Sequence, residues 1–428
     1  MNISEKIYVK IINVFIVLIS ITLIFRKPCT WFIILYSAFC LLNYKKLEFN
    51  KKALFISLFI ALPLIVELVL FWNNDSFVLG LKSLEKSTAL IVFPLFVIGN
   101  YKRISFIKIA NFYRIFTTLI VFVFYIFYIK TDVMYLTKYS KGIDIWELGY
   151  SFANFVGMHG PALNMHMAFV AICNFYFIFY KIKDNNIIVF ISNFLLFITS
   201  IFLVIYINSK LALFNALIGI LMIIFFEIRK KINTLKLVGL CGLLLIMFFG
   251  IINIYVKENP YMIKKYKEVT FAHMDKIGKL DELKDPEGQV YNSFVTRLSI
   301  WKSTIELSFK NLPFGVGASD GKPQLFKYYK QTNQFFLERH KLPVHNQFLD
   351  AFLKFGILGL LSITLYFLNM FYLGIKTKNV IICSFSFLFF ASNLTDDFLI
   401  RFDGIVFSAF WITIFTTFYL KTIDIDTR

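Results

Sequence analysis

His345 is the residue of this sequence best suited to acid–base chemistry. It follows Pro343 and precedes a long apolar segment that is predicted to form a helix from about Gln347. Because proline restricts the backbone before it and the helix fixes the chain after it, the imidazole would be held in one place at the mouth of a membrane span. Near neutral pH an imidazole can accept a proton from a hydroxyl group, which is the role of a general base.

Two cations are candidates for binding phosphate. Arg297 heads an amphipathic segment of the same predicted loop, and its guanidinium offers a planar fork of donors. Lys210 follows Asn208 and Ser209 in a tight connection between two apolar segments, where a headgroup phosphate could bind. A lysine that only snorkels to the membrane surface is the alternative. With His345, the two cations would suit displacement of a pyrophosphate leaving group, although the sequence leaves open whether these side chains meet.

Three further charges lie within a predicted membrane span. Such charges are costly, and they usually face the protein interior or a water-filled cavity. Lys82, Glu85 and Lys86 lie in the apolar segment 77–99 at i, i+3 and i+4 spacing, on one face of a helix. They form either a self-satisfied Lys–Glu cluster or the cationic wall of an outward-facing pocket.

Two adjacent acids, Asp396 and Asp397, are followed by Arg401 between the last two apolar segments. Adjacent acids alone are weak evidence for a divalent metal, and we favour a structural pair with Arg401. The five cysteines are scattered and support neither a disulfide framework nor a zinc site. No Gly-rich phosphate-binding loop occurs, so a lipid-linked sugar donor fits better than a nucleotide sugar. We predict no metal and no cofactor.

The composition is that of a membrane protein. Of the 428 residues 58% are hydrophobic and only 17% are charged, whereas soluble domains carry more charge and less apolar surface. The formal net charge of +19 could indicate nucleic acid binding. In a membrane protein, basic loops that meet anionic lipid headgroups are the better interpretation. We therefore predict contact with membrane lipids and none with nucleic acid.

The apolar segments predict an all-α polytopic integral membrane protein with about twelve transmembrane helices. The segments are 8–25, 31–43, 53–72, 77–99, 109–129, 161–180, 187–206, 210–228, 237–256, 347–373, 380–395 and 403–420. Lysine and arginine clusters follow the second, fourth, eighth and tenth segments. The positive-inside rule makes that side cytoplasmic, with both termini inside and the two longest connections outside.

Three regions follow from this topology. Residues 1–256 would form about nine spans and residues 347–428 about three more. Residues 257–346 would form a large, partly helical outer loop. Within that loop, apolar residues at helical spacing predict an amphipathic helix over 297–310, and the charged stretch 275–290 predicts an exposed excursion.

The segment 297–361 carries three linked motifs that resemble one family. They are R-x3-W from Arg297, P-x-G-x-G from Pro313, and H-N-x-x-L from His345. Together they resemble the signature region of the O-antigen ligase/polymerase family of membrane glycosyltransferases. Residues 315–320 (G-V-G-A-S-D) resemble the family's G-V-G-x-G-D form with a serine in place of one glycine. Weaker matches are Lys210, where the family usually has arginine, and His159, which is similar to the histidine of an H-P-x-Y segment.

The resemblance implies a GT-C-like, metal-independent, inverting glycosyltransferase of the bacterial inner membrane, with its active site facing the periplasm. The donor would be an undecaprenyl-diphosphate-linked glycan, and the acceptor the lipid A core or a growing glycan. By carry-over His345 would activate the acceptor hydroxyl, and Arg297 and Lys210 would hold the pyrophosphate. The other residues expected to bind substrate are Lys82, Lys86, Asn346 and His159.

Some alternatives stay open. Ligase, polymerase and protein-glycan ligase share these motifs, and a flippase or a chain-length regulator could act as a partner. A transporter or flippase of lipid-linked glycans without transferase chemistry is the alternative function. Transporters usually bind their substrates near the bilayer midplane, whereas the polar residues here collect at the outer interface, which favours a transferase.

Overall fold

A computed structural model describes residues 3–131, 145–180, 186–227, 271–291 and 293–426, with scattered positions between 233 and 253. The described residues form helices and connections, with no strand among them. The helices of the first half are α1 (Glu5–Thr22), α2 (Arg26–Leu42), α3 (Lys51–Val69), α4 (Phe77–Ser87), α5 (Ala89–Phe96), α6 (Phe106–Thr131), α8 (Ile145–Val156), α9 (Gly160–Tyr180), α10 (Ile187–Ile207) and α11 (Lys210–Phe226). Those of the second half are α14 (Pro286–Val290), α15 (Phe294–Lys310), α16 (Gly321–Gln331), α17 (Phe335–Arg339), α18 (Gln347–Thr377), α19 (Val380–Thr395) and α20 (Phe402–Asp426).

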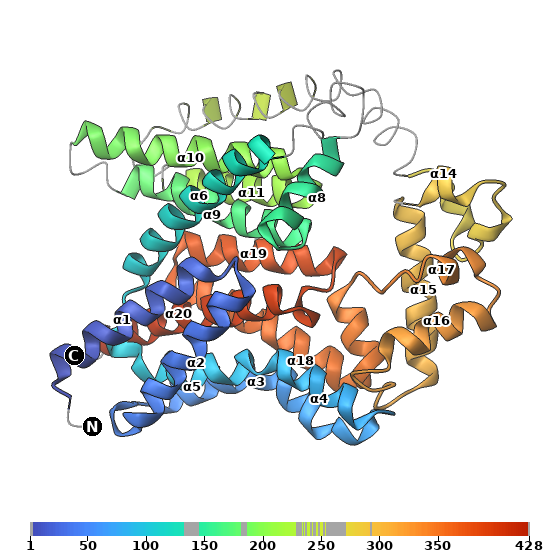
Figure 1. Ribbon diagram of the computed structural model, residues 1–428, viewed down its shortest axis with the longest axis horizontal. Helices are drawn as coiled ribbons and strands as arrows, with labels where there is room; N and C mark the ends of the chain where they lie inside the picture. The colour runs from blue at the N-terminus through green and yellow to red at the C-terminus, as the bar shows by residue number, and fades with distance from the viewer. Residues whose placement is uncertain are drawn as a thin grey trace.

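The apolar helices form one bundle (Figure 1). Six described helices, α3, α6, α9, α10, α18 and α20, are long and apolar enough to cross a membrane, and α11 and α19 are shorter apolar helices. Helices α9 and α20 are buried along most of their length, whereas α10 exposes large apolar side chains. The chain is therefore an all-α, multi-pass membrane protein, as predicted. The predicted segment 237–256 lies largely outside the described residues.

The segment 77–99, predicted as one span, forms two consecutive helices. Helix α4 ends at Ser87 and α5 begins at Ala89. The Thr88 N–H bonds to the Glu85 carbonyl three residues back, which interrupts the regular i to i−4 ladder. Lys82 and Lys86 thus lie on a short helix of 11 residues.

Helices α14 to α17 form a small lobe at one end of the bundle, and both chain termini lie at the opposite end (Figure 1). The lobe has its own apolar cluster, separate from that of the bundle. The predicted amphipathic helix is confirmed as α15, capped by the Ser293 hydroxyl, which accepts the Thr296 N–H. The predicted exposure of 275–290 is confirmed for most of its charged residues, whereas Leu280 and Val290 are buried in the cluster of the lobe and anchor the stretch.

The glycine-rich turn of the signature joins the lobe to the bundle. Helix α18 is broken at Gly356, where φ is 58°, so the carbonyls of Leu353 and Lys354 lose their helical partners. The N–H groups of Val316 and Gly317 donate to these two carbonyls at 3.0 and 2.9 Å. The turn therefore satisfies backbone groups that the break leaves open.

Glycine is required at this joint for two reasons. Gly356 and Gly315 both have positive φ, which favours a residue without a side chain. A Cβ atom added at Gly315 would lie 2.5 Å from the Lys354 carbonyl carbon, closer than real contacts allow. The same turn is fixed to the α3–α4 connection, because Asn73 Nδ2 donates to the Gly315 carbonyl at 3.0 Å. The signature turn thus positions α4 and α18 relative to each other.

Candidate active site

The backbone holds His345 in a strained conformation. Its φ is 50°, in the left-handed region that non-glycine residues seldom adopt. The Trp301 indole N–H of α15 donates to the neighbouring Val344 carbonyl at 3.1 Å, and Asn346 begins α18 directly after it. Strained residues persist only where the surrounding structure holds them in place, and they are most common at functional sites.

Asn346 positions the first turn of α18. Its side-chain oxygen accepts the N–H groups of Phe348 and Leu349 at 3.0 and 3.1 Å, which is a helix N-cap. Its amide nitrogen donates to the Leu394 carbonyl of α19 at 3.0 Å. Both polar ends of Asn346 are therefore used within the protein, and its predicted contact with substrate stays a prediction.

Asp396 is the partner of His345. Its Oδ1 lies 3.4 Å from His345 Nδ1 and also accepts the Asp397 N–H at 2.9 Å. Burial by itself would raise the pKa of Asp396, but the hydrogen bonds with His345 and the Asp397 N–H hold this pKa below its usual range. Asp396 is therefore ionised at neutral pH. A carboxylate at Nδ1 favours the tautomer that leaves Nε2 free to accept a proton.

Asp397 differs from its neighbour in environment and charge. Its carboxyl group is buried, and neither oxygen has a hydrogen-bond partner among the described residues. Burial and the nearby charges of Asp350 and Asp396 raise the pKa of Asp397, which favours the neutral acid. Arg401 lies at 3.9 Å from Asp397, so the predicted structural pair is present.

A first cavity of about 360 Å³ opens beside Asp396, and Arg297, Lys210 and Asp396 are among the residues that line it. Lys210 is exposed at the start of α11, where Asn208 ends α10 in the left-handed conformation and Ser209 completes the turn. Arg297 is half-buried on α15, and its guanidinium donates to the Thr395 carbonyl at the end of α19. The fold thus brings together two predicted cations that lie 87 residues apart in the chain.

His159 lies beside the first cavity, next to residues that line it. It precedes α9, whose first residues Gly160 and Pro161 line the cavity, and its ring centroid is 6.1 Å from that of Tyr150. Burial, with a smaller effect of the Arg401 charge, lowers the pKa of His159 to about 4. His159 is therefore neutral at pH 7 and would contact a substrate as a neutral hydrogen-bonding group.

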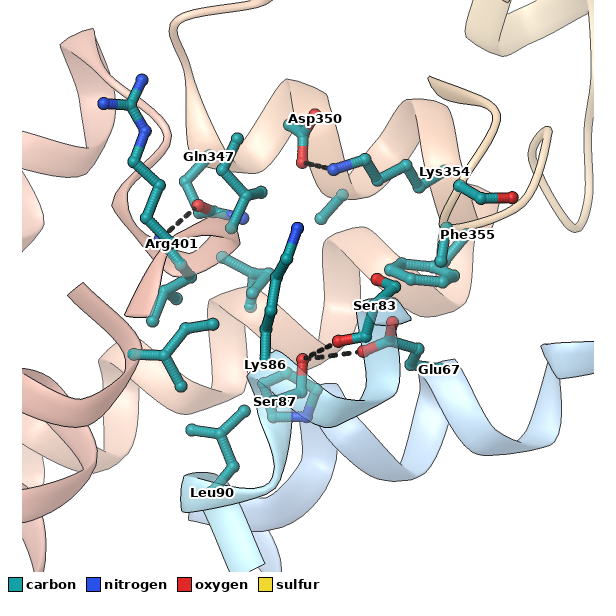
Figure 2. A pocket seen from close by; sticks show the side chains of 18 of the residues that line it. Glu67, Ser83, Lys86, Ser87, Leu90, Gln347, Asp350, Lys354, Phe355 and Arg401 are labelled. Carbon is teal, nitrogen blue, oxygen red and sulfur yellow. Dashed lines mark hydrogen bonds and ion pairs between the residues drawn. The ribbon is translucent and has the colours of Figure 1, made fainter. Parts of the chain in front are cut away.

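Lys82 and Lys86 line a different cavity, of about 410 Å³, on the other side of the turn Phe398–Ile400. The Lys86 ammonium points from α4 into this second cavity, toward the first turns of α18 (Figure 2). Phe398 lines the first cavity, whereas Leu399 and the residues after it line the second. The predicted phosphate-binding residues are therefore divided between two cavities.

Reasoning from the sequence missed three features of this region. It assigned Asp396 to a pair with Arg401 or a metal and did not anticipate its contact with His345, 51 residues away. It also missed Lys322 and Lys354, which line the second cavity. The G-V-G-A-S-D motif that precedes Lys322 was the available signal, because Ser319 and Asp320 bond to Asn74 and Asp75 just before α4 and so hold the start of α16 there.

Three possible metal ligands lie close together beside the first cavity, and Asp396 is the one of them that lines it. Ligand atoms of His345, Asp396 and Asp397 lie within 4.8 Å of one another. Such a set would offer a divalent cation one nitrogen and two oxygen ligands on one side. In the described structure, however, His345 and Asp396 already contact each other.

The fold and cavities define a helical multi-pass membrane protein whose titratable and cationic side chains gather where the bundle meets a small helical lobe. Residues 195–364 match the family model of O-antigen ligases. This match confirms the predicted relationship to the O-antigen ligase/polymerase family and includes Lys210, Arg297 and His345. No curated protein matches the chain.

Proposed function

We propose that this protein transfers a glycan from undecaprenyl diphosphate to an acceptor hydroxyl at the periplasmic face of the bacterial inner membrane. The observation that carries the proposal is that Asp396, which lies 3.4 Å from His345, lines the same cavity as Arg297 and Lys210. A base beside a cavity that two cations line suits a reaction in which a hydroxyl attacks and a diphosphate leaves. A transporter would need no oriented base of this kind.

In the proposed reaction His345 Nε2 accepts the proton of the acceptor hydroxyl while Asp396 orients the ring through Nδ1. The acceptor oxygen forms a bond to the anomeric carbon of the donor, and the bond from that carbon to the diphosphate oxygen breaks. The electron pair leaves with the diphosphate, whose added negative charge Arg297 and Lys210 stabilise. Attack opposite the leaving group inverts the anomeric configuration.

No metal is needed in this scheme, because the two cations take the role that a divalent ion has in many phosphate-displacing enzymes. Lys210 contributes a point charge, whereas Arg297 offers a fork of donors that matches phosphate oxygens. The uncharged His159 would add a hydrogen bond beside the first cavity. A chelator should therefore leave transfer by the purified protein unchanged, and loss of activity that Mg²⁺ restores would contradict this part of the proposal.

The test in cells is the profile of lipopolysaccharide and lipid-linked glycan after deletion of the gene, with complementation by wild type or His345→Ala. Loss of long glycan from lipid A with accumulation of full-length lipid-linked polymer would indicate a ligase. Cores capped with a single repeat unit would indicate a polymerase. A normal profile with His345→Ala at normal protein levels would refute the catalytic assignment and support the transporter alternative.

A further inference from the structure

We propose that a third cavity, at the end of α18 away from the candidate active site, binds phosphatidylglycerol as a structural ligand. The lipid phosphate would lie at Lys51 and Lys52, and an acyl chain would lie between α3 and α18. This inference goes beyond the proposed function and does not depend on glycan transfer.

The third cavity lies far from the two cavities of the candidate active site. It has a volume of about 520 Å³, and Leu365, Leu368 and Tyr372 of α18 form one of its walls. An α-helix rises by about 1.5 Å per residue, so Tyr372 lies roughly 24 Å beyond the break at Gly356. A molecule bound in the third cavity would therefore not touch the reactants.

Positive charge gathers at one end of the third cavity. Lys51 and Lys52 are the first two residues of α3, and both are exposed and line the cavity. Neither has an ion pair with another described residue, and none of the residues that line the cavity is acidic. The partial positive charge of the helix N-terminus adds to that of the two lysines. An anionic group therefore complements this end of the cavity.

The other polar groups of the cavity have hydrogens to donate. Asn369 is only 7% exposed, it lines the cavity, and its Nδ2 has no hydrogen-bond partner among the described residues. The hydroxyl oxygens of Tyr372 and Tyr419 lie 2.7 Å apart and share one hydrogen, so the second hydroxyl hydrogen is left for a ligand. Phosphate and ester oxygens are acceptors, and they would satisfy these donors.

The remaining wall of the third cavity is apolar. Phe55, Ile56 and Phe59 of α3 line it together with Leu365 and Leu368 of α18. Phe55 and Leu368 are exposed large apolar side chains. A ligand that contacts both the lysines and this wall must be amphiphilic, with one anionic head and an apolar chain.

The charge of the site selects one occupant. The ammonium group of a zwitterionic phospholipid would be repelled by Lys51 and Lys52, whereas the glycerol headgroup of phosphatidylglycerol carries no positive charge. An apolar helix of a second copy of this chain could cover Phe55 and Leu368, but its apolar face would bring no anion to the lysines. Phosphatidylglycerol supplies both the phosphate and the chain.

The test measures lipid binding to the purified full-length protein by native mass spectrometry. The probes are phosphatidylglycerol, phosphatidylethanolamine with the same acyl chains, and undecaprenyl phosphate. The decisive variant is Lys51→Gln with Lys52→Gln. Its matched control is Lys6→Gln with Lys10→Gln, which removes two exposed lysines of α1 that do not line the cavity.

We expect phosphatidylglycerol to bind more tightly than the other two probes. The change at Lys51 and Lys52 should weaken its binding by about tenfold or more, while the control stays within about twofold. Phosphatidylglycerol should also raise the Tm of the wild-type protein in detergent, because a ligand that binds only the folded state stabilises it. This increase should be smaller in the Lys51/Lys52 variant.

The apolar wall has its own matched pair. Leu368→Trp should fill the cavity and weaken phosphatidylglycerol binding. Leu361→Trp should not, because Leu361 is a similarly exposed residue of the same helix that does not line the cavity.

Several results would overturn the inference. They are equal effects of the two tryptophans, unchanged phosphatidylglycerol binding in the Lys51/Lys52 variant, and binding of phosphatidylethanolamine or undecaprenyl phosphate as tight as that of phosphatidylglycerol. A dimer that Leu368→Trp disrupts and phosphatidylglycerol does not would assign the cavity to a second copy of the chain. Because lipid binding is measured without glycan transfer, a protein that binds phosphatidylglycerol at Lys51 and Lys52 but transfers no glycan would refute the proposed function alone.

Discussion

Replacing Asp396 by Asn tests whether this carboxylate acts through His345. Asn has nearly the same shape, and its amide oxygen can still accept the Asp397 N–H that Asp396 accepts at 2.9 Å. The change removes the negative charge that lies 3.4 Å from His345 Nδ1 and permits the unproductive tautomer. The fold should persist while the base loses its orientation.

The magnitude follows from the role of a general base. A positioned base contributes roughly 10²–10⁴ in rate. At about 1.4 kcal/mol for each factor of ten, the loss lies between about 3 and about 6 kcal/mol of transition-state stabilisation. We therefore expect Asp396→Asn to lower kcat by about 10²-fold or more, with little change in the KM of the donor.

The assay is glycan transfer by purified protein from a lipid-linked donor, with His345→Ala, Asp396→Asn and the double variant compared in one cycle. If Asp396 acts through His345, the double variant should be no slower than His345→Ala alone. Fully additive losses would refute the reasoning and give Asp396 a separate role. Asp397→Asn is the matched control, because the raised pKa of Asp397 leaves little charge to remove; it should change kcat only a few-fold.

Three further outcomes follow from the structure. Gly356→Ala should lower the free energy of unfolding by about 1–3 kcal/mol, because a φ of 58° disfavours a residue with a side chain. The change would be measured as a reduced Tm in detergent. Leu358→Ala, at an exposed position of the same helix, should lower the free energy of unfolding by less. Between pH 6.5 and about 4 the unfolded chain binds a proton at His159 that the folded chain does not, so the protein becomes less stable as the pH is lowered through this range. His159→Gln should reduce the loss of Tm over this range, and an unchanged dependence of Tm on pH would contradict the assignment. Arg297→Lys keeps the charge but loses the fork of donors, so the KM of the donor should rise about tenfold, and an unchanged KM would exclude bidentate binding.

The sequence alone determined the features that depend on local pattern. Long apolar runs predicted the membrane helices, and apolar spacing predicted α15 within three residues of its start. The motifs around Arg297, Pro313 and His345 indicated the family that the match over residues 195–364 supports. These signals are local because helix formation and burial in lipid depend on neighbouring residues.

Only the tertiary structure decided how the charges are shared. It paired His345 with Asp396, and it placed Lys82 and Lys86 in a cavity apart from Arg297. The first result depends on the bond from Asn346 to the Leu394 carbonyl, and the second on the break at Gly356 and the turn that satisfies its carbonyls. Contacts between residues far apart in the chain set these positions, and no periodicity within one segment encodes them.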